Sequence, residues 1–193
     1  RPVDDVRENG FFINRLTIFL GKEIRHCGFF PSWNMRFFKR GLAFYEDREV
    51  HEHMIVADPV GYIREPMLHD DRRGLEHFIA KHNRYSTLEA KAIFTELNSP
   101  LPPSEANVTA DARRRRWLKR HVAPHLPSPG TWRFIYMYFL RLGILDGRVG
   151  LDFCRFISMY DYMVSLKLKD LRRIARHQRI AGAEAGGGLA VPE

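Results

Sequence analysis

The amino-acid sequence predicts an α/β fold in which strands occupy the first third of the chain and helices the rest. Runs rich in β-branched and aromatic residues alternate with turn signals between residues 10 and 69. From about Asp70 the spacing of apolar residues changes to the period of amphipathic helices. The chain of 193 residues is 45% hydrophobic and 12% aromatic, so it can bury the core of about one domain.

The predicted strands are separated by residues that favour turns. Gly10 precedes a run that is apolar on both faces, as expected of a buried strand, and Gly21 allows the chain to turn and pair back on it. Asp58-Pro59 is a turn signal between the last two strands. The predicted strands cover residues 11–20, 23–26, 37–41, 50–56 and 60–63.

Two helices are predicted after the strands. Asp71 can cap the first helix, whose buried stripe includes Phe78. Ser86 and Glu89 have the spacing of a capping box, in which the serine accepts a backbone N–H and the glutamate reaches back. A second helix is therefore predicted from Ser86 to about Leu97.

The last third of the chain is predicted to be helical. Residues 132–145 are its most apolar stretch, and Asp146-Gly147 turns the chain into a second amphipathic helix. That helix ends in arginines, which suit the negative end of a helix dipole. Its apolar stripe is Phe153, Phe156, Ile157, Tyr160, Met163, Val164, Leu168 and Leu171, with Arg155, Ser158, Asp161, Ser165 and Lys169 opposite.

These elements divide the chain into four parts. A domain of mixed sheet and helices covers residues 1–98, and a proline-rich linker covers 99–110. A basic amphipathic helical region follows over 111–180, and a glycine-rich flexible tail over 181–193.

The charge balance indicates an anionic partner. Lys and Arg outnumber Asp and Glu by 31 to 23, a net charge of +8, which suits nucleic acid, an acidic membrane surface or a phosphorylated small molecule. The two cysteines, Cys27 and Cys154, are too few for a disulfide-stapled domain, and without a C-x-x-C motif they predict no cysteine-based zinc site. No stretch has the roughly 18–20 uncharged apolar residues of a membrane-spanning helix.

The sequence His51-Glu52-His53 allows three interpretations. On a strand, His51 and His53 share one face and could bind Zn²⁺ with His69 as a third ligand. Alternatively, Glu52 faces a cleft as a general base, since modest desolvation raises the pKa of a carboxyl group toward neutrality. The third interpretation is a half-buried polar patch beside a turn.

Trp33 and Arg36 lie between two predicted turns. An aromatic face stacks on a sugar ring, and a guanidinium group binds oxyanions, so the pair could hold a sugar or a phosphate. The alternative is that Trp33 anchors a loop to the core.

Two further segments could meet an anionic surface. The basic run Arg113–Arg120, which contains Trp117, could bind nucleic acid or lipid headgroups, or be a solvated face. No zinc-finger, RNP or helix-turn-helix signature accompanies it, so nucleic acid is not expected as a partner. Residues 132–145 are either an interfacial segment, with Trp and Tyr at headgroup level, or an ordinary buried helix.

The motifs together resemble a known family. The segment Pro31–Gly41 is similar to the P-x-W-x-x-R-x-F-x-R-G stretch of bacterial family 2 glycosyltransferases, which build lipopolysaccharide core and exopolysaccharide. Other motifs follow in the expected order, so the resemblance covers roughly residues 8–170. They are Val50-His51-Glu52, Gly61-Tyr62-Ile63, Leu68-His69, Lys81–Ser86, Leu142–Gly147 with Gly150, and Tyr160–Lys169.

The resemblance implies a role for each candidate residue. Glu52 takes the position of the catalytic base that deprotonates the acceptor hydroxyl, and His51 would orient it. Trp33 and Arg36 would border the sugar or diphosphate site. His69 matches a position that helps to bind the divalent metal, Mg²⁺ or Mn²⁺, on the diphosphate.

The resemblance also implies a fold and partners. We expect the C-terminal, acceptor-side part of a GT-A glycosyltransferase with a helical, membrane-associating C-terminal region. Residues 1–69 contain no D-x-D motif at a strand end and no βαβ pattern, so we expect a nucleotide-binding half to precede this chain, which alone would be inactive. The metal is expected only with that half.

The expected reaction is an inverting sugar transfer for cell-envelope glycan synthesis, at the cytoplasmic face of the inner membrane with peripheral attachment. The expected partners are a nucleotide-sugar donor, a lipid-linked or glycan acceptor and an anionic membrane surface. The alternative is a non-catalytic basic module that binds an anionic membrane or nucleic acid through Arg113–Arg120.

Overall fold

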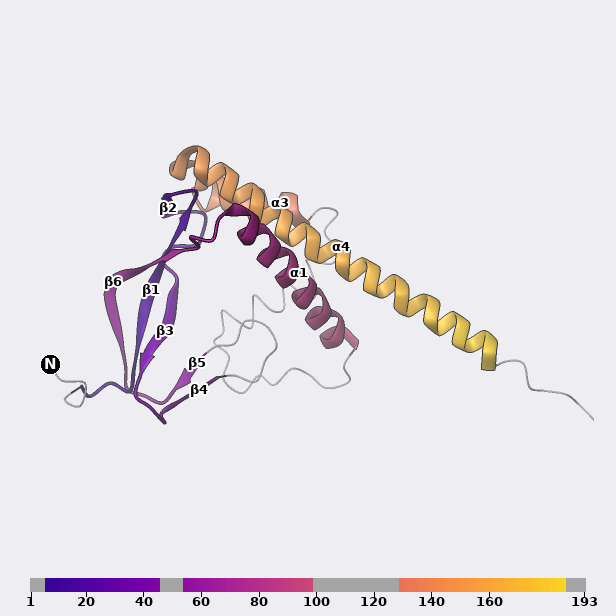
Figure 1. Ribbon diagram of the computed structural model, residues 1–193, viewed down its shortest axis with the longest axis horizontal. Coiled ribbons are helices and arrows are strands. Elements are labelled where there is room, and N and C mark those ends of the chain that lie inside the picture. The colour runs from indigo at the N-terminus through magenta and orange to yellow at the C-terminus, as the bar shows by residue number, and fades with distance from the viewer. Residues whose placement is uncertain (1–5, 46–53, 99–128, 187–193) are drawn as a thin grey trace, which may run out of the picture.

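A four-stranded sheet is built around the long apolar strand predicted at the start of the chain. The computed structural model describes residues 6–45, 54–98 and 129–186, and its strands are β1 (Gly10–Phe19), β2 (Lys22–Ile24), β3 (Trp33–Phe38), β4 (Ala43–Tyr45), β5 (Met54–Val56) and β6 (Val60–Asp70). β6 pairs in parallel with β1 along one edge, whereas β2 and β3 pair antiparallel with the two ends of its other edge (Figure 1). β4 and β5 form a separate two-stranded sheet.

The first hairpin confirms the sequence prediction. Leu20 and Gly21 form its turn, with φ of 47° and 75°, a region that glycine adopts without strain. β3 begins at Trp33, before the predicted start at Phe37, because Trp33 pairs with Asn14 of β1. Pairing across the sheet, which a local pattern does not report, sets this boundary.

The last two predicted strands differ from those observed. Residues 50–53 lie outside the described part of the chain, and β5 covers only the end of the predicted strand. β6 continues past the predicted end at Ile63. Its register with β1 shifts between Ile63 and Met67, and the strand then resumes pairing to Asp70. This irregularity interrupts the alternation that marks a strand in the sequence.

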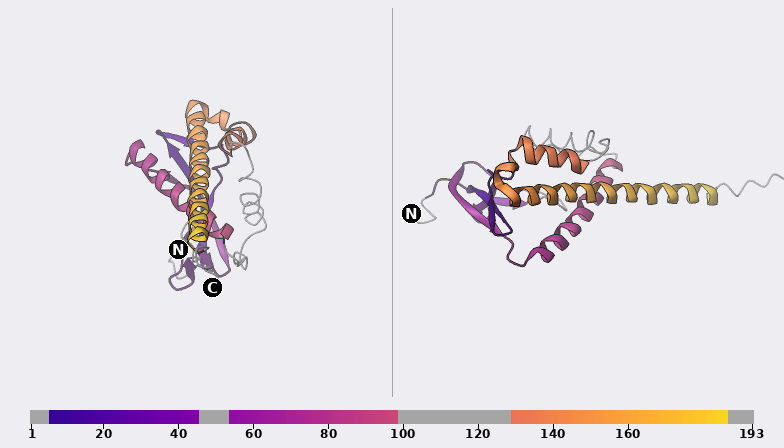
Figure 2. Two further views of the ribbon diagram at one scale, coloured as in Figure 1. Left: turned by 90° about the vertical axis from the view of Figure 1, so that its right-hand side faces the viewer. Right: turned by 90° about the horizontal axis from the view of Figure 1, so that it is seen from above.

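Helices form the rest of the described chain. They are α1 (Leu75–Asn98), α3 (Pro129–Ile135), a π-helical segment η3 (Tyr136–Leu140), a 3₁₀ turn η4 (Gly143–Asp146) and α4 (Gly147–Gly186). Viewed from above, α4 is long and straight, α3 runs beside its first part, and α1 crosses it (Figure 2). No helix in these described segments has the length and apolarity needed to cross a membrane.

The prediction of a helix start at Ser86 is wrong. α1 continues through this position, and Ser86 is fully buried within it. The Ser86 hydroxyl donates a hydrogen bond to the Asn83 carbonyl at 2.7 Å, and Lys167 of α4 donates to the same hydroxyl at 2.7 Å. The serine therefore serves the contact between α1 and α4, and tertiary packing overrides the local capping signal.

The apolar stripe predicted for α4 is confirmed by burial of Phe153, Phe156, Ile157, Val164 and Leu168. Two details are wrong. Ser158, predicted to lie opposite the stripe, is buried, and its hydroxyl donates to the Cys154 carbonyl at 2.6 Å. The helix also continues to Gly186, into the segment predicted as a tail.

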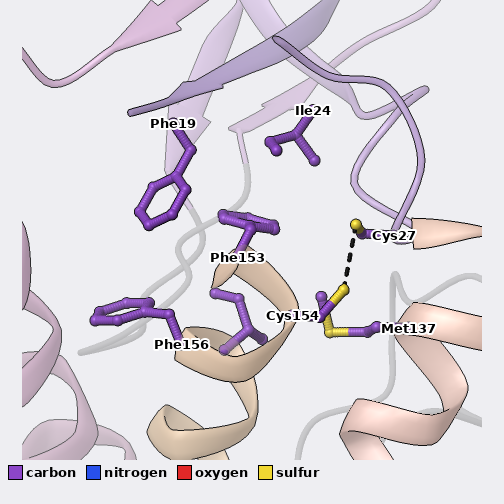
Figure 3. Close-up of a cluster of buried hydrophobic side chains, with 8 residues drawn as sticks. Phe19, Ile24, Cys27, Met137, Phe153, Cys154 and Phe156 are labelled. Carbon is purple, nitrogen blue, oxygen red and sulfur yellow. Dashed lines mark hydrogen bonds between the residues drawn. The ribbon is translucent and has the colours of Figure 1, made fainter. Parts of the chain in front are cut away.

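The core joins the upper end of the sheet to the helices (Figure 3). Phe153 of α4 contacts Phe19 of β1 and Phe29, with ring centroids 5.2 and 4.8 Å apart. The thiols of Cys27 and Cys154, distant in the sequence, lie 3.3 Å apart in the same cluster. The contact with Cys154, followed by burial, raises the pKa of the Cys27 thiol, so it stays protonated.

Asp146 fixes the turn before α4 to the sheet. Its carboxylate accepts hydrogen bonds from the backbone N–H groups of His26 at 2.9 Å and Arg25 at 3.3 Å, and the His26 ring Nδ1 lies 2.7 Å away. A residue predicted only as part of a turn therefore connects the two halves of the fold.

Polar contacts bind α1 to α4 further along. The Lys167 ammonium donates to the Asn83 carbonyl at 2.8 Å and to the Thr87 hydroxyl at 2.8 Å. Tyr160 donates to the Glu89 carboxylate at 2.6 Å. Each of these hydrogen bonds involves a charged group, which makes it stronger than a hydrogen bond between neutral groups. Together they fix the angle at which the two helices cross.

Candidate anion-binding site

Strand register brings two basic side chains together on one face of the sheet. Thr17 of β1 is paired with His69 of β6. Side chains alternate along a strand, so Arg15 and Thr17 share a face, and His69 projects from that face of the neighbouring strand. Arg15 is half-buried, whereas His69 is exposed.

Arg36 joins this group through an irregularity in β3. The register between β1 and β3 shifts between Phe11 and Phe12, and Arg36 is the residue left without a register partner. Such a bulge redirects a side chain. Burial is the main cause that lowers the pKa of Arg15 and of His69, and the nearby charge of Arg36 lowers both further.

Lys81 approaches the same group from α1. Its ammonium lies 3.2 Å from the Asp71 carboxylate, and its charge also lowers the pKa of His69. Asp71 is in turn bound by Arg73, whose Nε lies 2.9 Å away, and the pKa of its carboxyl group is held well below the usual range. We call Arg15, Arg36, His69 and Lys81 the basic cluster.

Positive charge in the basic cluster exceeds the negative charge placed against it. Within the described residues, Asp71 is the carboxylate that raises the pKa of His69, and Asp71 already pairs with Arg73 and Lys81. The Arg15 Nε is buried without a hydrogen-bond partner among the described residues. Burial, followed by the charge of Arg36, lowers the pKa of Arg15.

A partly buried cationic group with an unbonded N–H is costly unless something satisfies it. A bound oxyanion would supply the missing negative charge and the missing hydrogen-bond acceptor. Its charge offsets the repulsion between the cations, and its oxygens accept hydrogen bonds from guanidinium groups. The basic cluster is therefore suited to phosphate or diphosphate oxygens.

Trp33, the other predicted binding residue, lies away from the basic cluster. It pairs with Asn14, the neighbour of Arg15 in β1, so it projects from the opposite face. There Trp33 packs edge-on against Tyr62, which stacks on Phe12, with centroids 5.2 and 5.3 Å apart. The structure thus brings Arg36 and His69 together but places Trp33 on the other face, 42% exposed.

The remaining predicted residues lie outside the described part of the chain. They are His51, Glu52 and His53 of the proposed catalytic or zinc motif, and the basic run Arg113–Arg120. Residues 46–53 connect Tyr45 to Met54, which are register partners in the β4–β5 pair. The roles of Glu52 and His51 stay predictions.

The described residues around His69 do not fit a divalent cation. No group of three His, Cys, Asp or Glu side chains within these segments is placed to hold a metal ion. The Asp71 carboxylate is engaged by Arg73 and Lys81, and the other neighbours of His69 are basic. Mg²⁺ and Mn²⁺ prefer several free carboxylate or phosphate oxygens, so we assign no step to a metal here.

Sequence reasoning missed two members of the basic cluster. Arg15 stands inside an apolar run that reads as a buried strand, and Lys81 stands in a helix. Arg15 could have been found as a charged residue in an otherwise buried strand, since burial of an arginine requires a partner. Lys81 lies within the quoted motif Lys81–Ser86, but nothing local indicates that it faces the sheet.

In comparisons with protein-family models, with curated proteins and with solved structures, no match to this chain was found.

Proposed function

We propose that this chain is the acceptor-side part of an inverting glycosyltransferase, in which the basic cluster binds the diphosphate of a nucleotide-sugar donor. The observation that carries the proposal is the excess of positive charge at Arg15, Arg36 and Lys81 around His69, with the Arg15 Nε buried and without a hydrogen-bond partner among the described residues. The order of the sequence motifs supports the reaction class. The sequence indicates Arg36 and His69 as binding residues, and both belong to the basic cluster.

The chemistry is a single displacement. Glu52 accepts the proton of the acceptor hydroxyl, and the oxygen attacks the anomeric carbon of the donor sugar. The bond from that carbon to the diphosphate oxygen breaks, so the nucleoside diphosphate leaves with the electron pair. Arg15, Arg36 and His69 would stabilise the negative charge that develops on this leaving group.

Arg36→Gln tests the proposal in the natural protein at its full length. A panel of uridine, guanosine and thymidine diphosphate sugars is supplied with a glycolipid fraction, and release of nucleoside diphosphate is measured. We expect one donor class to be turned over, and Arg36→Gln to reduce kcat/KM by about 10²-fold, because a charged contact to the leaving group is lost.

Arg64→Gln is the matched control, since Arg64 is an exposed arginine of the same sheet that lies outside the basic cluster. It should retain nearly full turnover. Absence of nucleoside diphosphate release with every donor, or equal losses in the two variants, would refute the proposal.

A further inference from the structure

The segment before α4 exposes large apolar side chains. Phe139 is 55% exposed, Leu140 71%, Leu142 51% and Leu145 63%. These four exposed side chains fall within seven positions of the sequence, and groups of exposed apolar side chains in soluble proteins mark interaction sites. We call Phe139, Leu140, Leu142 and Leu145 the apolar tip.

The backbone holds the apolar tip in a defined shape. Leu142 has a φ of 56°, a left-handed conformation that reverses the chain, and the Arg141 N–H donates to the Tyr136 carbonyl at 2.8 Å. Gly143 packs so closely that a Cβ there would lie 2.8 Å from the Cys27 Sγ and 2.9 Å from the Cys154 Sγ. One side of the segment is therefore fixed to the core, and the apolar side chains extend from the other.

The outward face of α4 adds basic and apolar side chains. It lies opposite the buried stripe and repeats with helical spacing, and Met159, Tyr162 and Leu166 are each about 45% exposed. Basic residues outnumber acidic ones on this face, where Asp152 and Asp170 make only surface pairs with Arg155 and Arg173. Its exposed members are Arg148, Asp152, Arg155, Met159, Tyr162, Leu166, Lys169, Asp170, Arg173, Arg176 and Ile180.

The far end of α4 also exposes basic and apolar side chains. Figure 1 shows the helix continuing well past the end of α1, and Leu171 is the last of its residues packed against the α1–α4 core cluster. A shallow groove in this end is lined by Lys169, Arg172, Arg173, Arg176, His177 and Ile180.

We propose that the apolar tip and the outward face of α4 form a docking surface for an anionic phospholipid bilayer. The apolar tip would enter the boundary between headgroups and acyl chains, while the arginines of α4 would contact lipid phosphates. This inference does not rest on the proposed glycosyltransferase activity.

Charge favours a bilayer over the other occupants of such a face. A second copy of the chain would bring arginine-rich faces together, and like charges repel. Nucleic acid would satisfy the arginines but not side chains such as Leu140 and Leu145, which have no aromatic ring to stack on a base. An anionic bilayer offers phosphates and an apolar interior to the same surface.

Vesicle co-sedimentation of the natural protein at its full length tests this inference. The probes are vesicles of phosphatidylcholine alone and vesicles with about a third phosphatidylglycerol. We expect binding to the anionic vesicles that weakens in high salt, and an affinity about tenfold lower for the double variant Leu140→Ser, Leu145→Ser. The charge variant Arg148→Gln, Arg155→Gln, Arg173→Gln should lose the salt-dependent part of the binding.

Phe44→Ser is the matched control. Phe44 is 61% exposed on β4, at the end of the sheet away from α4 (Figure 1), so its loss should leave vesicle binding unchanged. Circular dichroism establishes that each variant is folded. Four results would each overturn the inference: no binding to anionic vesicles, no effect of the leucine variant, equal loss with Phe44→Ser, or self-association that the leucine variant abolishes. Oligonucleotide binding in place of vesicle binding would also overturn it.

Discussion

Replacement of Glu52 by Gln is expected to slow sugar transfer by the natural full-length protein by about 10²–10⁴-fold. An amide keeps the size and hydrogen-bonding capacity of the side chain but cannot accept the acceptor's proton, so the general-base contribution is lost. The measurement is kcat with the donor that the natural protein uses. Donor KM should change little, because a base that acts on the acceptor hydroxyl makes no contact with the donor.

Glu65→Gln is the control for this substitution. Glu65 is an exposed carboxylate of β6, and its loss should leave kcat and the thermal unfolding midpoint nearly unchanged. If Glu52→Gln retains more than a few per cent of the natural transfer rate, Glu52 is not the base.

Phe153→Ala is expected to lower the free energy of unfolding by about 3–5 kcal/mol. Phe153 is 1% exposed and contacts rings from both the sheet and the helices, so its loss leaves a cavity where the two halves of the fold meet. Urea unfolding of the natural protein at its full length, followed by near-ultraviolet circular dichroism, measures the change.

Tyr162→Ala is the comparison on the same helix. Tyr162 is 46% exposed on the outward face, so its truncation should change the free energy of unfolding by less than about 0.5 kcal/mol. A loss below about 1 kcal/mol for Phe153→Ala would mean that the core can collapse around the missing ring and does not join the two halves as described.

The elements that the sequence predicts well are those whose pattern is complete within one segment. β1 is apolar on both faces, and α4 has a regular apolar stripe, so the local period alone identifies both. The capping signal at Ser86 fails for the opposite reason. The serine hydroxyl serves Lys167 of another helix, and a local motif cannot report a partner distant in the chain.

The candidate site follows the same rule. Arg36 and His69 are indicated by residue type and by the family resemblance, but the basic cluster exists only through strand register. Arg15 reaches His69 because Thr17 pairs with His69, and Arg36 reaches both through a bulge. Neither register nor bulge can be derived from residue type, which also explains why Trp33 was expected beside Arg36 although it lies on the opposite face.

The apolar tip lies in a segment for which the sequence pattern is compatible with two structures. Residues 132–145 are apolar enough for a buried helix or an interfacial segment, and composition does not decide between them. The structure buries Met137 and Gly143 against the core but leaves Leu140 and Leu145 exposed. The chain reverses direction at Leu142, and this reversal determines which side chains are buried and which are exposed. No residue pattern in the sequence predicts the reversal.

Calorimetric titration of the natural full-length protein with inorganic pyrophosphate, with and without Arg15→Met, tests the central claim most directly. Arg15 is half-buried, and its Nε has no hydrogen-bond partner in the part of the chain that the structure describes, so the account predicts that Arg15→Met weakens pyrophosphate binding about tenfold or more. The same variant should unfold no more easily than the natural protein, because a charge that repels Arg36 has been removed. Unchanged pyrophosphate affinity in a folded Arg15→Met protein would contradict the account.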